Sequence, residues 1–186
     1  MKLQDEILHK MIPYATDKNI SLYLTPINDT LEEFNIKKPI EIAQFIAQIT
    51  HESGSLAYVE ELASGSAYEY RRDLGNMSRE ALTAAHAKGT TTGKFYKGRG
   101  LIQVTGYFNY KECGIMLGID LVNNPELLKE PKYAAKSAGW FWFSRGLNKI
   151  SHDCKRTTRV INGGYNGLAE REAYFKRNCL LLSTYN

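Results

Sequence analysis

The segment PIEIAQFIAQITHESG occupies residues 39–54 and has the pattern of a buried helix. Pro39 suits the first turn of a helix, where its missing N–H would have no partner. The helix has one apolar face, formed by Ile42, Phe45, Ile46 and Ile49. Gly54 then supplies a residue at which a helix can stop. The segment therefore predicts a core helix with Glu52 at its polar end.

Further helices are expected on both sides of this segment. Thr25-Pro26 has the form of a cap followed by a proline, so we expect a helix to begin there. Ser78 can cap a short helix that runs to about Lys88, and residues 88–93 are expected to form a loop. The other expected helices span residues 105–117, 131–145, 153–162 and 168–182. Few segments alternate with period two, so we expect a mainly α fold with little or no β-sheet.

The composition is that of one ordinary globular domain. The chain has 186 residues, of which 43% are hydrophobic and 24% are charged. It contains no internal repeat or low-complexity linker, so we expect a single domain over residues 1–186 without a separate binding module. No stretch approaches the roughly 20 apolar residues that a membrane span needs, and the amino terminus lacks the apolar run of a secretory signal.

Positive charge is concentrated in the last third of the chain. Residues 1–61 hold 5 Lys and Arg against 10 Asp and Glu, whereas residues 129–186 hold 11 against 4. Such a basic segment suits an anionic partner, although most charged runs are only solvated faces. Two interpretations therefore stay open, electrostatic contact with an anionic envelope and a solvated surface without a partner.

Glu52 and Glu61 are the acidic residues whose separation is most informative. Glycosidases use two carboxylates, about 6.5–9.5 Å apart in inverting enzymes and about 5–5.5 Å apart in retaining ones. In one straight helix, the interval between these residues would separate them by about 13.5 Å along the axis. The chain must therefore fold back after Gly54 if the two are to act together. Spacing alone also allows both to be ordinary surface carboxylates.

The pair His51-Glu52 does not make a metal site. The zinc-protease motif HExxH needs a second histidine at position 55, which is Ser55. The triplet Gly98-Arg99-Gly100 lacks the further glycine and lysine of nucleotide-binding loops. We therefore expect no metal and no cofactor.

Several segments occur together in a recognisable order. They read FIAQITHESG at residues 45–54, GKFYKGRGLIQVT at 93–105, NY at 109–110 and VINGG at 160–164. In this order they resemble glycoside hydrolase family 19, which comprises plant and bacterial chitinases and many bacteriophage endolysins. The resemblance implies a lysozyme-like, two-lobed helical domain with a central substrate cleft. It also implies hydrolysis of β-1,4 bonds to N-acetylglucosamine-type sugars in a single displacement with inversion.

The resemblance assigns roles to individual residues. Glu52 matches the family's general acid, Glu61 matches the general base, and Glu60 is the alternative base should the alignment shift by one. Thr105 matches a hydroxyl that helps to hold the attacking water. Gln103, Asn109 and Asn162 match positions that hydrogen-bond the sugar, and Tyr96 would offer it a ring face and a hydroxyl. Arg171, grouped with these substrate-binding positions, matches an arginine that the family places near the acid. Amide side chains suit N-acetyl and hydroxyl groups because each amide both donates and accepts hydrogen bonds.

The motifs do not choose between chitin and peptidoglycan, which share β-1,4 bonds and N-acetyl groups. The small, basic chain without an export signal suits an endolysin of the muramidase type that cuts peptidoglycan during host cell lysis. We therefore expect a monomer with peptidoglycan strands as its partner and no nucleic acid, made in the host cytoplasm and acting on the cell wall after release. The alternatives are a chitinase acting on N-acetylglucosamine polymers, and an inactive glycan- or nucleic-acid-binding module.

Overall fold

The computed structural model describes residues 1–184, so residues 185–186 of the expected domain lie outside it. Its α-helices are α1 (Asp5–Met11), α2 (Asp17–Glu33), α3 (Pro39–Glu52), α4 (Arg79–Ala87), α5 (Thr92–Phe95), α6 (Tyr107–Leu117), α7 (Pro131–Ser144), α8 (Cys154–Asn162) and α9 (Leu168–Ser183). Short 3-10 helices are η1 (Ser66–Tyr68), η2 (Pro125–Lys129) and η3 (Leu147–Ile150). Within residues 1–184, strand-like pairing is limited to isolated bridges around Arg99. The expected mainly α fold is confirmed.

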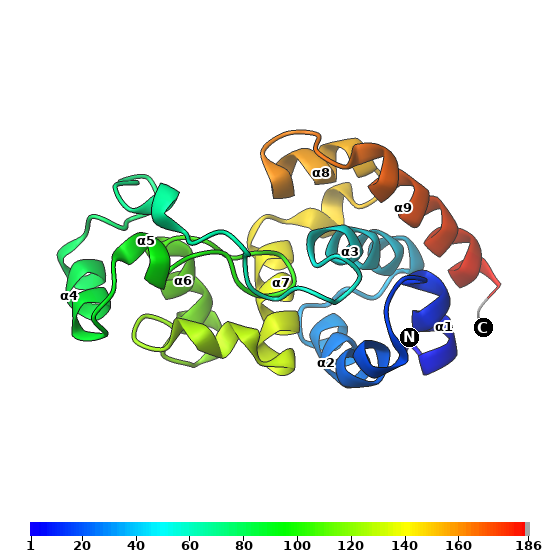
Figure 1. Ribbon diagram of the computed structural model, residues 1–186. Helices are drawn as coiled ribbons and strands as arrows, with labels where there is room; N and C mark the ends of the chain where they lie inside the picture. Colours follow the sequence, from blue (N-terminus) through cyan, green and yellow to red (C-terminus); the bar gives the residue numbers. More distant parts are fainter. Residues whose placement is uncertain (185–186) are drawn as a thin grey trace.

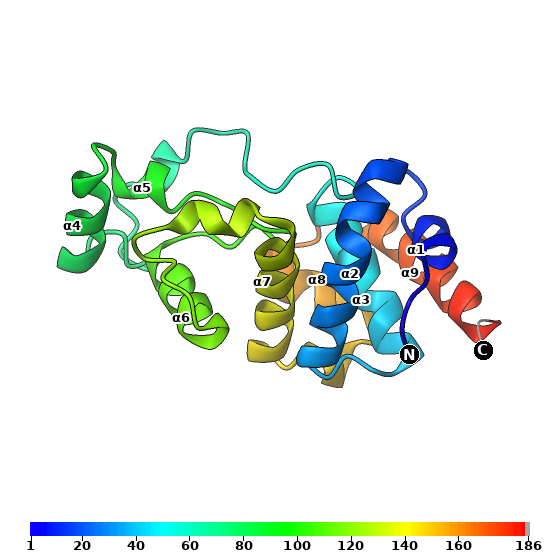
Figure 2. The ribbon, with the colours of Figure 1, turned by 90° about the horizontal axis from the view of Figure 1, so that it is seen from below.

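The helices form two lobes (Figure 1). One lobe contains α1, α2, α3, α8 and α9, the other contains α4, α5 and α6, and α7 lies between them. The view from below shows the same separation, with the segment that follows α3 running from the first lobe to the second (Figure 2). The two-lobed arrangement expected from the sequence is therefore confirmed. No helix within residues 1–184 combines the length and apolar character needed to cross a membrane.

Helix α3 is the buried centre of its lobe. Every residue from Glu41 to Thr50 is buried, and the helix packs along α9. The ring of Phe45 meets that of Trp142 edge-on, with centroids 5.4 Å apart. Each large apolar side chain buried in this way contributes about 1.5–3 kcal/mol to stability. The position of the Glu52 end of α3 is therefore fixed by the core.

Most helix ends follow the local signals in the sequence. Helix α3 begins at Pro39, as expected. Ser78 accepts a hydrogen bond from the N–H of Ala81 at 3.2 Å and so caps α4. Asp153 accepts one from the N–H of Arg156 at 2.9 Å and so caps α8. These side chains satisfy N–H groups that have no partner inside the first turn of a helix.

The helix expected to begin at Pro26 begins at Asp17 instead. Thr16 accepts a hydrogen bond from the N–H of Asn19 at 3.2 Å, and α2 then continues through Pro26. A proline inside a helix removes one backbone hydrogen bond and crowds the preceding turn. Buried side chains on both sides of the proline, Tyr23 and Ile27 among them, hold the helix together across it. Tertiary packing thus overrides the local signal for a helix start.

Gly139 allows α7 to lie close against α2. A Cβ atom on Gly139 would lie 2.3 Å from Cδ2 of Phe34 and 2.5 Å from Cγ2 of Thr30. We expect Gly139→Ala to lower the free energy of unfolding by about 1–3 kcal/mol, as overpacking does in other cores. Urea unfolding followed by circular dichroism measures this change. Ser144→Ala, at an exposed position of the same helix, should change stability by less than about 0.5 kcal/mol. Equal effects of the two substitutions would contradict the close packing.

Candidate active site

The chain leaves the helical path immediately after Glu52. Helix α3 ends there, and residues 54–56 follow with φ angles of 54°, 60° and 65°. The hydroxyl of Ser53 donates to the Ile49 carbonyl at 2.6 Å and accepts the N–H of Leu56 at 2.9 Å. Side chains rarely adopt this left-handed conformation, which costs about 1–2 kcal/mol per residue. The left-handed backbone thus ends the helix at Glu52, as the pairing of the two carboxylates requires.

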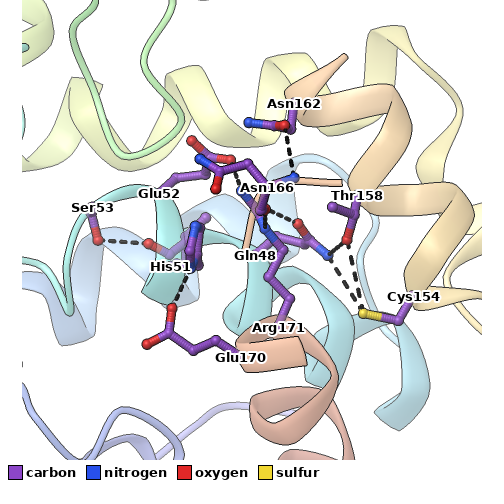
Figure 3. A network of polar contacts seen from close by, with 11 residues as sticks. Gln48, His51, Glu52, Ser53, Cys154, Thr158, Asn162, Asn166, Glu170 and Arg171 are labelled. Atoms are coloured by element: carbon purple, nitrogen blue, oxygen red, sulfur yellow. Dashed lines mark hydrogen bonds and ion pairs between the residues drawn. The ribbon is translucent and has the colours of Figure 1, made fainter. Parts of the chain in front are cut away.

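Glu52 is held by Arg171 of α9 (Figure 3). Nη2 of Arg171 contacts Oε1 of Glu52, and Nη1 donates to Oε1 of Gln48 at 2.5 Å. The Arg171 side chain is 1% exposed and the Glu52 side chain is 15% exposed. Gln48 in turn donates to the hydroxyl of Thr158 on α8 at 3.2 Å. These contacts fix one carboxylate oxygen, while Oε2 of Glu52 has no hydrogen-bond partner within residues 1–184.

A second pair joins the same two helices one residue earlier. Nδ1 of His51 contacts Oε2 of Glu170, which directly precedes Arg171. The imidazole ring lies against the backbone of Gly167, where a Cβ atom would lie 2.0 Å from the ring. Two adjacent contacts, His51–Glu170 and Glu52–Arg171, therefore hold the end of α3 against the start of α9.

Glu61 lies on the returning segment and is oriented by neutral donors. Its own N–H donates to the Gly98 carbonyl at 2.9 Å, and the N–H of Gly98 donates to its Oε2 at 3.1 Å. The hydroxyl of Tyr68 donates to its Oε1 at 3.1 Å. Burial, followed by the neighbouring Glu61 carboxylate, raises the pKa of Tyr68 above its usual range. The phenol therefore remains a protonated donor at neutral pH.

Glu60, the alternative base, lies in a cluster of cations. Its carboxylate is 3.3 Å from Nζ of Lys97, 3.1 Å from Nε of Arg99 and 3.2 Å from Nζ of Lys129. Burial alone would raise the pKa of Glu60, but the hydrogen bond from Lys129 and the charges of the three cations hold it below its usual range. These contacts suit a structural carboxylate, so the geometry favours Glu61 over Glu60 as the base.

Three of the expected site residues converge on Gly98. A Cβ atom there would lie 3.3 Å from Oε2 of Glu61, 3.3 Å from Oγ1 of Thr105 and 2.8 Å from Oε1 of Gln103. The hydroxyl of Thr105 donates to the Gln103 carbonyl at 2.9 Å. Gln103 has a φ angle of 57°, and such backbone strain is concentrated at functional sites. The absence of a side chain at position 98 thus allows a carboxylate, a hydroxyl and an amide to share one small region.

Two further expected residues present amide groups. Asn109, in the first turn of α6, donates to the Thr105 carbonyl at 2.7 Å and is half-buried. Asn162, the last residue of α8, is exposed and accepts the N–H of Asn166 at 3.3 Å. Asn109 is therefore joined to the Glu61 side of the site and Asn162 to the loop that leads to Arg171.

Tyr96 and Arg171 are both buried and offer no surface to a sugar, whereas the expected place of Arg171 beside the candidate acid is confirmed. Tyr96 is 0% exposed, and its hydroxyl donates to the Val122 carbonyl at 2.8 Å. The expected ring face for a sugar is therefore wrong, and Tyr96 is a core residue. Arg171 is also 0% exposed, and its guanidinium is used by Glu52 and Gln48. It orients the carboxylate and has no surface for a ligand.

Apart from Arg171, the residues that support the two carboxylates were missed in the sequence. Gln48 could have been found, because it lies one helical turn before Glu52 and so shares its face. Gly98 stands inside the quoted motif, but only the folded chain shows what surrounds it. Tyr68 follows Glu61 by seven residues and Glu170 belongs to distant α9, and neither carries a local signal.

Comparisons with sequences of known proteins point to one family. The family model described as Chitinase class I matches residues 26–174. An endochitinase of Arabidopsis thaliana is 37% identical over 125 residues, which covers 67% of this chain and 39% of that protein. An endochitinase of Solanum tuberosum is 31% identical over 183 residues, which covers 82% and 55%. The chain thus spans about 40% to 55% of the length of these relatives.

Solved structures of the same family share the fold. Chitinase C from Streptomyces griseus matches with a TM-score of 0.75 and 26% identity, over 97% of this chain and 76% of that one. A bacterial family 19 chitinase matches with a TM-score of 0.75 and 24% identity, over 98% and 95%, which supports the fold alone. Because the family model covers residues 26–174, the chain belongs to glycoside hydrolase family 19, the class I chitinase family.

Proposed function

We propose that the chain hydrolyses β-1,4 glycosidic bonds of N-acetylglucosamine-containing glycans in a single displacement with inversion. The observation that carries this proposal is the pair of carboxylates with different surroundings. Glu52 lies against a buried guanidinium, whereas Glu61 is held by a phenol and a backbone N–H. Glycosidases assign acid and base roles to two carboxylates in different environments.

Glu52 acts as the general acid. It donates its proton to the oxygen of the leaving sugar as the glycosidic bond breaks. Oε2 has no partner within residues 1–184 and is the atom available to carry this proton. Arg171 lies against Oε1 and stabilises the carboxylate that remains after the transfer.

Glu61 acts as the general base on a water molecule. As the oxygen of this water bonds to the anomeric carbon from the opposite face of the sugar, Glu61 removes one of its protons. Tyr68 and Gly98 orient the carboxylate without neutralising it. The Thr105 hydroxyl lies on the same side of Gly98 and is placed to hold the water.

Chitin-type glycans are the substrate class that the comparisons support, because the relatives are named chitinases and endochitinases. Gln103, Asn109 and Asn162 supply amides that suit N-acetyl and hydroxyl groups. Peptidoglycan is the second candidate substrate, with the chain acting as an endolysin on the cell wall. The exposed cations of α8, Lys155, Arg156 and Arg159, favour this candidate, because peptidoglycan carries carboxylates and chitin is neutral.

Glu52→Gln and Glu61→Gln are each expected to lower kcat on soluble chitin oligomers by about 10²–10⁴-fold, because each removes one proton-transfer group. Both substitutions preserve side-chain shape, so KM and the circular dichroism spectrum should change little. Release of reducing ends measures kcat. Glu60→Gln is the matched control, since it removes the same charge one residue away and should reduce kcat far less. A greater loss in Glu60→Gln than in Glu61→Gln would transfer the role of base to Glu60.

Parallel digestion of chitin hexamers and purified peptidoglycan separates the two substrates. We expect cleavage of the hexamers, because the relatives are named as endochitinases. Both materials contain the bond on which the carboxylates act. Mass analysis of the products identifies the bond that is cut. Cleavage of peptidoglycan alone, with reducing ends on N-acetylmuramic acid, would replace the chitinase proposal by a muramidase of the endolysin type.

A further inference from the structure

The exposed face of α8 carries cations that have no carboxylate partner. Lys155, Arg156 and Arg159 are all exposed. Within residues 1–184, none of their charged nitrogens lies within 4.0 Å of a carboxylate oxygen. The cations around Glu60, by contrast, are ion-paired. The charge of the α8 face is therefore free to act on a ligand.

These cations line a hollow in the surface, the α8 hollow. It has a volume of about 610 Å³ and is lined by Asp153, Lys155, Arg156, Arg159, Val160 and Tyr165. Nζ of Lys155 lies 5.4 Å from the ring centre of Tyr165, and the guanidinium carbon of Arg159 lies 5.9 Å from it. Nη1 of Arg159 also donates to the Tyr165 hydroxyl at 3.4 Å. Lys155 and Arg159 therefore both lie beside the ring of Tyr165 in this hollow.

The negative charge in the α8 hollow is limited to Asp153. Its Oδ1 accepts the N–H of Arg156 at 2.9 Å, because it caps the start of α8. One carboxylate faces three cations, so the lining keeps a net positive charge. A neutral polymer would gain nothing from this excess, whereas a carboxylate would pair with it.

The α8 hollow adjoins the loop that supports the candidate acid. Tyr165 directly precedes Asn166, whose carbonyl accepts Nε of Arg171 at 3.2 Å. The N–H of Asn166 donates to Asn162, the expected sugar-binding residue at the end of α8. Figure 3 shows Asn162, Asn166 and Arg171 together beside Glu52. One short loop therefore links the lining of the α8 hollow to the arginine that contacts Glu52.

We propose that the α8 hollow binds carboxylate groups carried by the glycan that the site hydrolyses. The inference rests on the proposed function and deepens it, because it specifies an anionic, carboxylate-bearing N-acetylglucosamine polymer. Arg159 offers the planar donor pair that matches a carboxylate, and Lys155 adds a point charge beside it. Peptidoglycan, whose lactyl and peptide groups carry carboxylates, has this chemistry.

Two soluble polymers with the same backbone test the proposal, since carboxymethyl chitin is anionic and glycol chitin is neutral. Binding is measured by isothermal titration calorimetry with the Glu52→Gln protein, which should not degrade either polymer. Combining this substitution with Lys155→Gln and Arg159→Gln should weaken binding of carboxymethyl chitin by about fivefold in about 50 mM NaCl, the effect of two exposed ion pairs. Binding of glycol chitin should change little, and added salt should remove the difference.

The matched control replaces Lys18 and Lys88 by Gln in the same Glu52→Gln background. Both are exposed and neither lines the α8 hollow, so the control removes equal charge without touching the hollow. An equal loss of carboxymethyl chitin binding in the control would reduce the effect to net charge and overturn the proposal. Equal losses on the two polymers would also overturn it.

Two further outcomes have distinct meanings. A short DNA duplex that binds more tightly than carboxymethyl chitin, and loses affinity with the same two substitutions, would assign the α8 hollow to nucleic acid and overturn the proposal. Unsubstituted protein that cleaves neither polymer would overturn the proposed function. The binding comparison with the Glu52→Gln protein would still measure how much the α8 hollow contributes to polymer binding, because it does not depend on cleavage.

Discussion

The left-handed turn of residues 54–56 is the constraint on which the geometry of the site depends. A helix that continued past Glu52 would carry Glu61 about 13.5 Å further along its axis. After the turn, the chain instead runs to Gly98, whose carbonyl accepts a hydrogen bond from the backbone N–H of Glu61. Leu56, inside the turn, is 2% exposed, and its carbonyl accepts a hydrogen bond from Asn19 of α2 at 3.1 Å. The unfavourable backbone conformation is thus maintained by burial and by a contact with another helix.

The two carboxylates are positioned by different kinds of structure. Glu52 ends a core helix and is tied to α9 through Arg171, so its position follows from the packing of one lobe. Glu61 lies outside regular helices and is placed by Gly98 and Tyr68. A charged partner for one and neutral partners for the other give the two groups unequal electrostatic surroundings. Rigid support of this kind is what a preorganised acid and base require.

Local chemistry made much of the fold predictable. The caps at Ser78 and Asp153 and the apolar face after Pro39 each depend on neighbouring residues only, and the structure follows them. The start of α2 was not predictable in this way, because burial on both sides of Pro26 decides whether the helix continues.

The sequence predicted those features of the site that the chemistry of two cooperating carboxylates requires. The need for two nearby carboxylates predicted that the helix stops after Glu52, which its end there and the left-handed φ angles of residues 54–56 confirm. The choice between Glu60 and Glu61 depends on which cations surround each, and these come from distant segments. Tyr96 shows the same limit, because an aromatic ring suits a sugar and a core equally well until its burial is known.

In the proposed mechanism, Glu61 activates a water molecule while Glu52 protonates the leaving oxygen. The configuration of the first product tests this division of roles. Proton NMR during the first minutes of chitin hexamer cleavage, before mutarotation, reports the anomer at the new reducing end. Single displacement by a water held at Glu61 predicts the α-anomer from a β-1,4 bond. The β-anomer as the first product would mean retention and would contradict the role of Glu61 as base.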